Sequence, residues 1–211
     1  MLFNFLYPFA DQFSLLNVFR YLTFRTGGAV ITALVVSFVF GPLLISALKR
    51  RQNGGQPIRA DGPEEHLITK QGTPTMGGFL ILLALGVSTL LWADLGNAYI
   101  WAALVVTAGF GLIGFCDDYF KVTRRDSDGL PGTLKLVLQG LIAVAASYWI
   151  MRTLPAPLNE TLAVPFFKDL LVPLGWSFLI LAAFVIVGAS NAVNLTDGLD
   201  GLAIGPIMIA A

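Results

Sequence analysis

Two adjacent carboxylates, Asp117 and Asp118, stand at the end of a long apolar run and are followed by Lys121. A carboxylate at the centre of a bilayer costs about 2.5–3.5 kcal/mol on insertion scales, so the pair marks the place where a helix leaves the lipid. Neighbouring residues of a helix point about 100° apart. The two carboxylates are therefore expected to serve different partners rather than chelate one ion side by side. The simpler alternative is a helix end that is charged without having a function.

A second polar stretch, residues 191–201, separates two apolar segments. Amides and carboxylates recur in it at every third position, where neighbouring members of the series share a face of a helix. Glycines between them leave room for a ligand to approach the backbone. The pattern favours a binding surface over a solvated turn between helices, and its members are Asn191, Asn194, Asp197 and Asp200.

Together the two stretches provide carboxylates in a chain that has one histidine and one cysteine. Such a ligand set suits a hard cation, and Mg²⁺ typically binds one or two carboxylates together with substrate phosphates. Lys70, in a polar loop rich in glycine and proline, adds a point charge that favours phosphate. His66 in the same loop is either a solvated side chain or a substrate contact. The residues alone thus indicate Mg²⁺-dependent chemistry on a phosphate.

The composition identifies an integral membrane protein. The 211 residues are 56% hydrophobic and 12% charged, whereas soluble domains carry about 25% charged residues. The single cysteine, Cys116, excludes an intramolecular disulfide and a cysteine-based metal cluster. Nothing in the sequence suggests that the protein binds nucleic acid.

The apolar runs predict an all-α, polytopic transmembrane helical bundle, because each approaches the roughly 20 residues that cross the hydrocarbon of a bilayer. Aromatic residues at positions 1–25 favour an N-terminal interfacial helix. The chain is expected to form a single transmembrane domain, residues 1–211, that stops inside a helix. We expect five complete spans and the start of a sixth at Leu202; the complete spans are Gly27–Leu48, Met76–Trp92, Ala98–Cys116, Leu136–Met151 and Leu170–Ser190.

Basic residues are distributed unequally between the two ends of these spans. The loops after the first and third spans hold most of the lysines and arginines, including the run from Lys49 to Arg51. The positive-inside rule places these loops in the cytoplasm. The N-terminus is then outside, and both acidic stretches face the cytoplasm.

Three motifs resemble those of the phospho-N-acetylmuramoyl-pentapeptide translocase family. They are RADGPEEH and KQGTPTMGG within residues 59–78, GFCDDYFK at 114–121, and NAVNLTDGLDGLA at 191–203. The last two have counterparts across the superfamily of polyprenyl-phosphate N-acetylhexosamine-1-phosphate transferases, and the first is similar to the muramoyl-pentapeptide branch. The resemblance runs along essentially the whole chain.

This resemblance implies an enzyme of the bacterial inner membrane with a cytoplasmic active site. Its reaction transfers phospho-MurNAc-pentapeptide from UDP-MurNAc-pentapeptide to undecaprenyl phosphate, which gives lipid I and UMP for peptidoglycan synthesis. The implied cofactor is Mg²⁺, and the implied partners are both substrates, membrane lipid and, as an open option, a second copy in a homodimer. The resemblance implies catalytic roles for Asp117, Asp118 and Lys121, metal binding by Asp117 and Asp118, and substrate binding by His66, Lys70, Asn191, Asn194, Asp197 and Asp200.

The family has ten transmembrane helices, and this chain covers only the first part of them. A later Mg²⁺-binding aspartate and a histidine-rich cytoplasmic loop of the family have no counterpart within these residues, so the 211 residues alone are expected to be inactive. Three alternatives stay open: another transferase of the superfamily, a secondary transporter that couples ions through carboxylates, and a non-catalytic scaffold. Transporter carboxylates usually lie near the bilayer midplane, whereas these lie at one edge.

Overall fold

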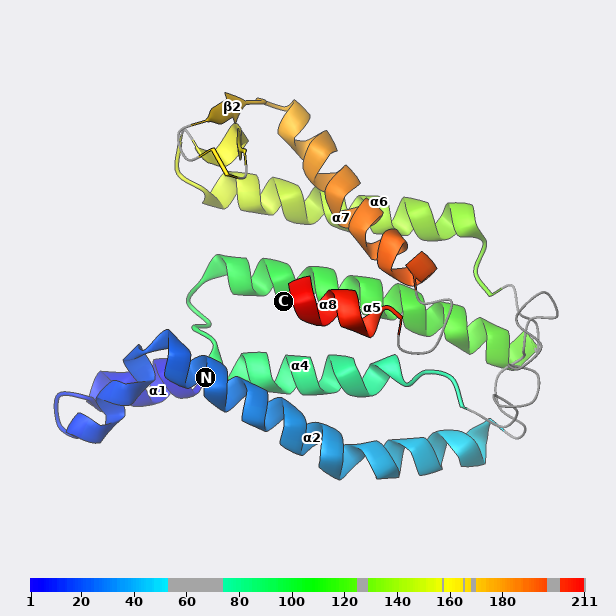
Figure 1. Cartoon of the computed structure of the whole chain (residues 1–211), viewed down its shortest axis with the longest axis horizontal. Helices are drawn as coiled ribbons and strands as arrows, with labels where there is room; N and C mark the ends of the chain where they lie inside the picture. Colours follow the sequence, from blue (N-terminus) through cyan, green and yellow to red (C-terminus); the bar gives the residue numbers. More distant parts are fainter. Residues whose placement is uncertain are drawn as a thin grey trace. The chain divides into compact units, whose positions relative to one another are not determined.

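The computed structural model describes residues 1–52, 74–124, 129–156, 158–164, 166–167, 170–196 and 202–210. The fold divides into two compact units, Met1–Gly132 and Thr133–Ala211. Both are built mainly from helices, as Figure 1 shows, and this confirms the predicted helical class.

The N-terminal segment of the first unit is helical but broken. It consists of α1 (Leu2–Leu6), the 3₁₀ turn η1 (Tyr7–Phe9) and the 3₁₀ helix η2 (Ser14–Arg20). Pro8 lies within η1 and has no amide hydrogen to donate, so a continuous helix is disfavoured at that point. The N-terminal segment predicted as an interfacial helix is therefore a series of short helical turns.

Asn4 of α1 ties this segment to the turn that follows α4 (Gly78–Trp92). Its Nδ2 donates to Oδ1 of Asp94 at 2.9 Å, and its Oδ1 accepts from the amide of Leu95 at 3.0 Å. The Asn4 hydrogen bond, followed by one from the amide of Gly96, lowers the pKa of Asp94 below its usual value. These hydrogen bonds hold the N-terminal segment against the turn, and they favour the ionised form of Asp94.

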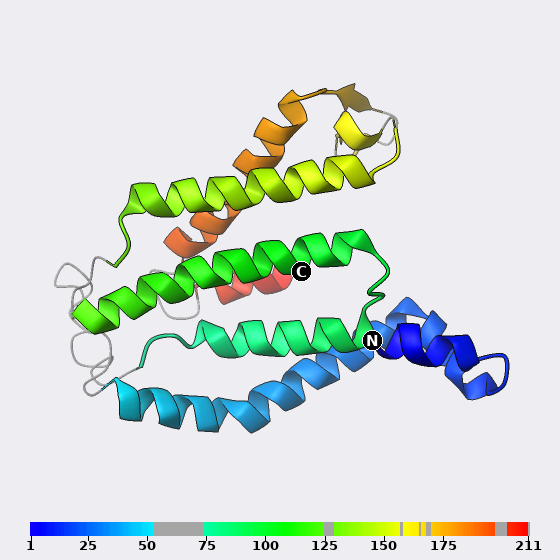
Figure 2. The ribbon, with the colours of Figure 1, turned by 180° about the vertical axis from the view of Figure 1, so that it is seen from behind.

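Three long helices form the body of the first unit: α2 (Leu22–Arg51), α4 and α5 (Ala98–Arg124). They lie side by side in Figure 1 and again from behind in Figure 2, with α4 between the other two. Helix α2 changes direction partway along, and it contains Pro42, whose missing amide hydrogen interrupts the helical bonding. Helix α5 continues to Arg124, past the predicted end of the third span at Cys116, so the carboxylate pair lies within a helix.

Small residues let these helices approach one another, as is common in membranes. At Gly28 of α2, an added Cβ would overlap the ring of Trp92 from α4. That ring is held in place, because its Nε1 donates to the hydroxyl of Thr32 at 2.9 Å and its face stacks on Phe19. Gly28 therefore fixes how closely α2 and α4 pack.

We expect Gly28→Ala to lower the thermal midpoint of the purified protein in detergent, because overpacking a close contact costs about 1–3 kcal/mol. The matched control is Gly27→Ala, since nothing lies within 4 Å of a Cβ added at Gly27. Alanine there should leave the midpoint unchanged or raise it, because alanine favours a helix over glycine by about 0.5–1 kcal/mol. Equal midpoints for the two variants would contradict the close contact.

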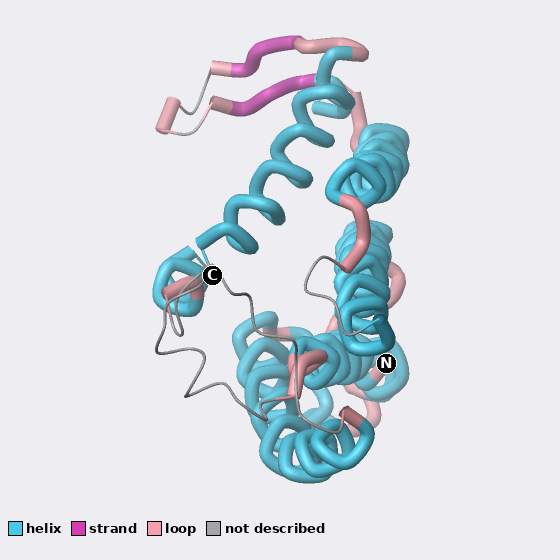
Figure 3. The backbone as a smooth tube through the Cα atoms, turned by 90° about the vertical axis from the view of Figure 1, so that its right-hand side faces the viewer, coloured by secondary structure: helices cyan, strands magenta, loops and turns pink. Residues whose placement is uncertain are grey.

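In the second unit a short hairpin joins helices α6 and α7, and the short helix α8 follows. Helix α6 (Gly132–Thr153), which begins at the last residue of the first unit, is followed by η3 (Leu158–Glu160), β1 (Thr161–Ala163), β2 (Leu171–Pro173), α7 (Ser177–Thr196) and α8 (Ile204–Ala210). The strands pair antiparallel, with Leu162 opposite Val172, and Figure 3 shows them side by side in magenta.

This hairpin corrects the predicted fifth span. The span was expected to begin at Leu170, but residues 171–173 form a strand, and α7 begins only at Ser177. Pro173 explains the boundary, because its missing amide hydrogen suits the end of an edge strand better than the interior of a helix.

Four helices within the described residues are long and apolar enough to cross a membrane, namely α2, α5, α6 and α7. Their large apolar side chains are exposed, among them Phe38 at 78% and Ile180 at 75%, as expected for surfaces that face lipid. Helix α4 is apolar but has 15 residues, about 22 Å of helix. The chain is a multi-pass membrane protein.

Candidate functional site

The predicted carboxylate pair lies near the C-terminal end of α5. Asp117 is buried, with only 7% of its surface exposed. Its Oδ2 forms an ion pair with Nζ of Lys121 at 2.8 Å, across one turn of the same helix. Its Oδ1 accepts a hydrogen bond from the amide of Leu130 at 2.7 Å. Asp117 thus joins the end of α5 to the backbone that leads into α6.

Gly129 allows this backbone to approach the ion pair. It adopts a φ of +63°, in the left-handed region that favours glycine. A Cβ at this position would overlap Oδ1 of Asp117 and lie 2.8 Å from Cε of Lys121. Any larger residue would therefore have to displace the pair.

Asp118 contacts a different part of the chain. Its Oδ2 accepts from the hydroxyl of Thr75 at 2.8 Å and from the amide of Met76 at 3.2 Å, immediately before α4 begins. The start of a helix carries a partial positive charge that stabilises a nearby carboxylate. The two carboxylates thus have different partners in the structure, as the 100° separation on a helix predicts.

Two residues that the sequence did not single out support Asp118. Gln52, which ends α2, is buried, and its Oε1 accepts from the amide of Thr75 at 2.9 Å. Its Nε2 donates to the carbonyl oxygen of Thr75 at 3.2 Å. Thr75 lies within the KQGTPTMGG motif, whereas Gln52 follows a basic run and has no sequence signal that would have identified it.

Met76 occupies a strained backbone conformation beside this carboxylate. Its φ is +70°, a region that non-glycine residues seldom adopt. Such conformations cost about 1–3 kcal/mol and gather at functional sites. In this conformation the amide of Met76 donates to Asp118. The backbone strain thus accompanies a contact with the carboxylate.

The second polar stretch lies in the second unit, on α7 and beyond it. Asn191 donates through Nδ2 to Oε1 of Gln139 on α6 and to the carbonyl oxygen of Val187, both at 2.8 Å. Asn194 is exposed on the same helix. Asp197 and Asp200, like His66 and Lys70 of the polar loop, lie outside the described residues. A joint site of the two acidic stretches therefore stays a prediction.

The two carboxylates differ in how far their oxygens are already engaged by other groups. The described residues contain no group of three or more histidine, cysteine, aspartate or glutamate side chains that could hold a metal ion. Both oxygens of Asp117 are engaged by Lys121 and Leu130. In Asp118 both hydrogen bonds from the described residues reach Oδ2, and none from this part of the chain reaches Oδ1. Asp118 is therefore the better metal ligand of the pair in this arrangement.

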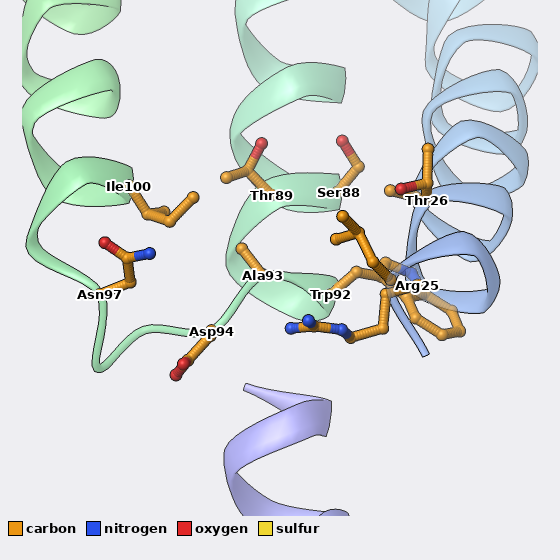
Figure 4. Close-up of a pocket in the computed structure, with 11 residues that line it drawn as sticks. Arg25, Thr26, Ser88, Thr89, Trp92, Ala93, Asp94, Asn97 and Ile100 are labelled. Atoms are coloured by element: carbon orange, nitrogen blue, oxygen red, sulfur yellow. The ribbon is translucent and has the colours of Figure 1, made fainter. Parts of the chain in front are cut away.

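A cavity of about 240 Å³ lies at the other end of the first unit. Figure 4 shows Arg25 and Trp92 among its lining residues, with Asp94 at the turn after α4. Nε of Arg25 is buried there without a hydrogen-bond partner, while the guanidinium lies 4.3 Å from the ring centroid of Phe3. Asp118 meets the N-terminal end of α4 and this cavity meets its C-terminal end, so the cavity takes no part in the chemistry of the carboxylate pair.

Comparison with known proteins identifies two matching family patterns in the sequence. Residues 100–211 match the model of glycosyl transferase family 4, and residues 70–82 match signature 1 of the phospho-N-acetylmuramoyl-pentapeptide-transferases. The chain is 58% identical over 211 residues to the phospho-N-acetylmuramoyl-pentapeptide-transferase of Granulibacter bethesdensis. It is 55% identical over 216 aligned residues to the enzyme of the same name from Maricaulis maris.

Each alignment covers all of this chain but only 58% and 59% of the respective relative. The chain thus spans about three fifths of the length of the curated relatives that it matches. The family model covers more than half of the chain and includes Asp117 and Asp118, and the signature includes Thr75 and Met76. The chain therefore belongs to glycosyl transferase family 4.

Proposed function

We propose that the full-length protein transfers phospho-MurNAc-pentapeptide from UDP-MurNAc-pentapeptide to undecaprenyl phosphate and releases UMP. The products are lipid I and the nucleotide, in the synthesis of peptidoglycan precursors. Both relatives are named for a phospho-N-acetylmuramoyl-pentapeptide transfer. The proposal extends that activity to this chain.

One observation carries the proposal. The signature segment and the family-model segment are separate in the sequence, yet Thr75 and Met76 of the first donate hydrogen bonds to Asp118 of the second. A signature typical of the muramoyl-pentapeptide enzymes is thereby joined to the carboxylate pair. This contact links substrate choice to the charged groups that would handle phosphate.

The proposed mechanism relies on positioning and charge. A phosphate monoester has a second pKa of about 6, so the acceptor lipid phosphate is mostly dianionic at neutral pH. A general base then has little proton to remove, and orienting the reactants is the larger contribution. Oδ1 of Asp118 would hold Mg²⁺, which when bound supplies charge neutralisation at the diphosphate.

Asp117 and Lys121 would act together in this scheme. The ion pair at 2.8 Å fixes the ammonium of Lys121 in one place. An ammonium is a point charge that binds phosphate, so Lys121 would hold an oxygen of the phosphate during transfer. Lys70, His66 and the polar stretch from Asn191 to Asp200 would bind the nucleotide sugar, as the resemblance implies.

The test is an assay of the full-length protein with Mg²⁺, undecaprenyl phosphate and labelled UDP-MurNAc-pentapeptide. Lipid I and UMP in equal amounts are the expected products. UDP-GlcNAc, tested in parallel, distinguishes another HexNAc-1-phosphate transferase of the superfamily. Turnover of UDP-GlcNAc alone would replace the proposed donor, and loss of lipid I on removing Mg²⁺ by chelation would support the metal.

We also infer that residues 1–211 alone make no lipid I, since the relatives are far longer than this chain. The same assay with the isolated 211 residues tests this inference. Cross-linking of the full-length protein in membranes tests whether it forms a homodimer.

The proposed orientation puts the N-terminus outside and the carboxylate pair on the cytoplasmic side of the inner membrane. Arg51, at the end of α2, and Leu158, in η3, are both exposed and lie at positions predicted to face opposite compartments. In a Cys116→Ser background, Arg51→Cys should react with impermeant thiol reagents only from the cytoplasmic side, and Leu158→Cys only from outside. The reverse pattern would invert the topology.

A further inference from the structure

The amide side chain of Gln52 connects three segments at the carboxylate pair. Gln52 ends α2, Thr75 precedes α4, and Asp118 belongs to α5. Two hydrogen bonds join Gln52 to the backbone of Thr75, and the hydroxyl of Thr75 reaches Asp118. We propose that Gln52 is a positioning residue that fixes Asp118 for the transfer reaction by clamping Thr75; this inference rests on the proposed function.

The geometry of the clamp is specific. The Gln52 amide both donates to and accepts from the same residue, so Thr75 can neither rotate nor slide along α2 without losing a bond. Gln52 is only 7% exposed, and water would not readily replace the lost partner. A buried polar group whose partner is removed pays its full desolvation cost. Gln52 is therefore better suited to holding a fixed geometry than to contacting solvent.

The strained backbone of Met76 lies next to this clamp. A residue at φ +70° would relax if its surroundings allowed it. Thr75 is its immediate neighbour, and Gln52 bonds both peptide units that flank Thr75, accepting from its amide and donating to its carbonyl oxygen. Loss of the clamp should release both donors, the Thr75 hydroxyl and the Met76 amide, from Oδ2 of Asp118.

The first measurement is turnover of the full-length protein. Gln52→Leu, which removes both hydrogen bonds at similar volume, should lower kcat about tenfold with little change in KM for the nucleotide sugar. Thr75→Val should lower kcat to a similar extent, and Thr75→Ser, which keeps the hydroxyl, should restore most of it. Gln52→Glu keeps the acceptor for the Thr75 amide and should give an intermediate loss.

A double-mutant cycle tests whether Gln52 and Thr75 act on Asp118 through the same contacts or independently. If Gln52 acts through Thr75, the Gln52→Leu/Thr75→Val double variant should lose about as much as either single variant, roughly tenfold. Independent contributions would multiply to about a hundredfold and would overturn the proposal. The controls are Thr123→Val, whose hydroxyl donates to the carbonyl of Tyr119 on α5, and Gln12→Leu at an exposed position. Both should retain wild-type turnover.

Hydrogen exchange provides a readout that does not depend on the reaction. The amides of Thr75 and Met76 are both hydrogen-bonded, and both should exchange at least tenfold faster in Gln52→Leu, while the amide of Ala93 at the other end of α4 should not change. Unchanged exchange would overturn the clamp even in an active protein.

The outcomes keep the two proposals apart. A wild-type protein that makes no lipid I contradicts the proposed function, and hydrogen exchange still decides whether Gln52 holds Thr75. A wild-type protein that makes lipid I, with Gln52→Leu folded and fully active, contradicts only the role of Gln52. Size-exclusion and thermal-midpoint measurements show whether Gln52→Leu is folded. If it is not, Gln52→Glu takes its place in the test, because glutamate retains the volume of glutamine and one hydrogen bond.

Discussion

Replacing Asp118 with asparagine is expected to lower the turnover of the full-length enzyme by roughly 10²–10³-fold, the usual effect of losing one charged or polar group that stabilises a transition state. Asparagine keeps the shape of the side chain, and its oxygen can still accept from Thr75 and Met76. What it removes is the negative charge at Oδ1. The protein should therefore fold and insert normally while losing phosphate chemistry.

Asp117→Asn should reduce turnover strongly for a different reason. The substitution removes the ionic partner of Lys121, which then has no fixed position from which to hold a phosphate oxygen. The matched control is Asp94→Asn, a hydrogen-bonded carboxylate at the opposite end of α4, which should keep wild-type turnover. Steady-state assays of lipid I formation measure all three variants. Wild-type rates for both Asp117→Asn and Asp118→Asn would support the simpler alternative, in which the pair is a charged helix end without function.

Gly129→Ala is expected to have a large effect without changing any charge. Alanine at a φ of +63° costs about 1–2 kcal/mol, and its Cβ would overlap Oδ1 of Asp117. Relief of that overlap requires the carboxylate to turn away from Leu130 and from Lys121. We expect turnover to fall by about tenfold to a hundredfold, because displacement of a catalytic group by 1 Å or so can cost that much.

Two further glycines separate the causes of this loss. Gly175 also has a positive φ, +54°, but its neighbour is Glu160, at 3.8 Å from an added Cβ. Gly175→Ala should lower the thermal midpoint through backbone strain and leave turnover unchanged. Gly132→Ala, with nothing within 4 Å of its Cβ, should change neither quantity. Wild-type turnover of Gly129→Ala, together with a lowered thermal midpoint, would contradict the prediction. It would show that the backbone is strained but that the position of Asp117 does not limit the reaction.

Apolar runs predicted the long helices well because lipid imposes a length and a composition that soluble folds do not require. They did not predict where α5 ends. The hydropathy pattern located the lipid boundary near Cys116, whereas the helix continues to Arg124 and includes Asp117 with its partner Lys121. The place where a helix leaves the lipid thus need not be the place where the helix ends.

The partners of the carboxylates could be predicted only in part. Helical geometry alone showed that Asp117 and Asp118 diverge, since that depends on neighbours in the sequence. Thr75 and Gln52 are 43 and 66 positions before Asp118, and their contact depends on how α2, α4 and α5 pack. The short strands β1 and β2 were missed for a related reason, because three residues are too few to show an alternating pattern.

The bond between Asn4 and Asp94 has a consequence for the timing of biosynthesis. The two residues are 90 positions apart, so the bond cannot form until the ribosome has made both α2 and α4. At about 5–20 residues per second, translation of the intervening chain takes roughly 5–20 s. During this interval the aromatic side chains of residues 2–20 can reach the start of α2, as Phe3 does with Arg25 and Phe19 with Phe24, but not Trp92 of α4. The first segment to be synthesised thus completes its bonds to Asp94 and Leu95 only after α2 and α4 have both been made.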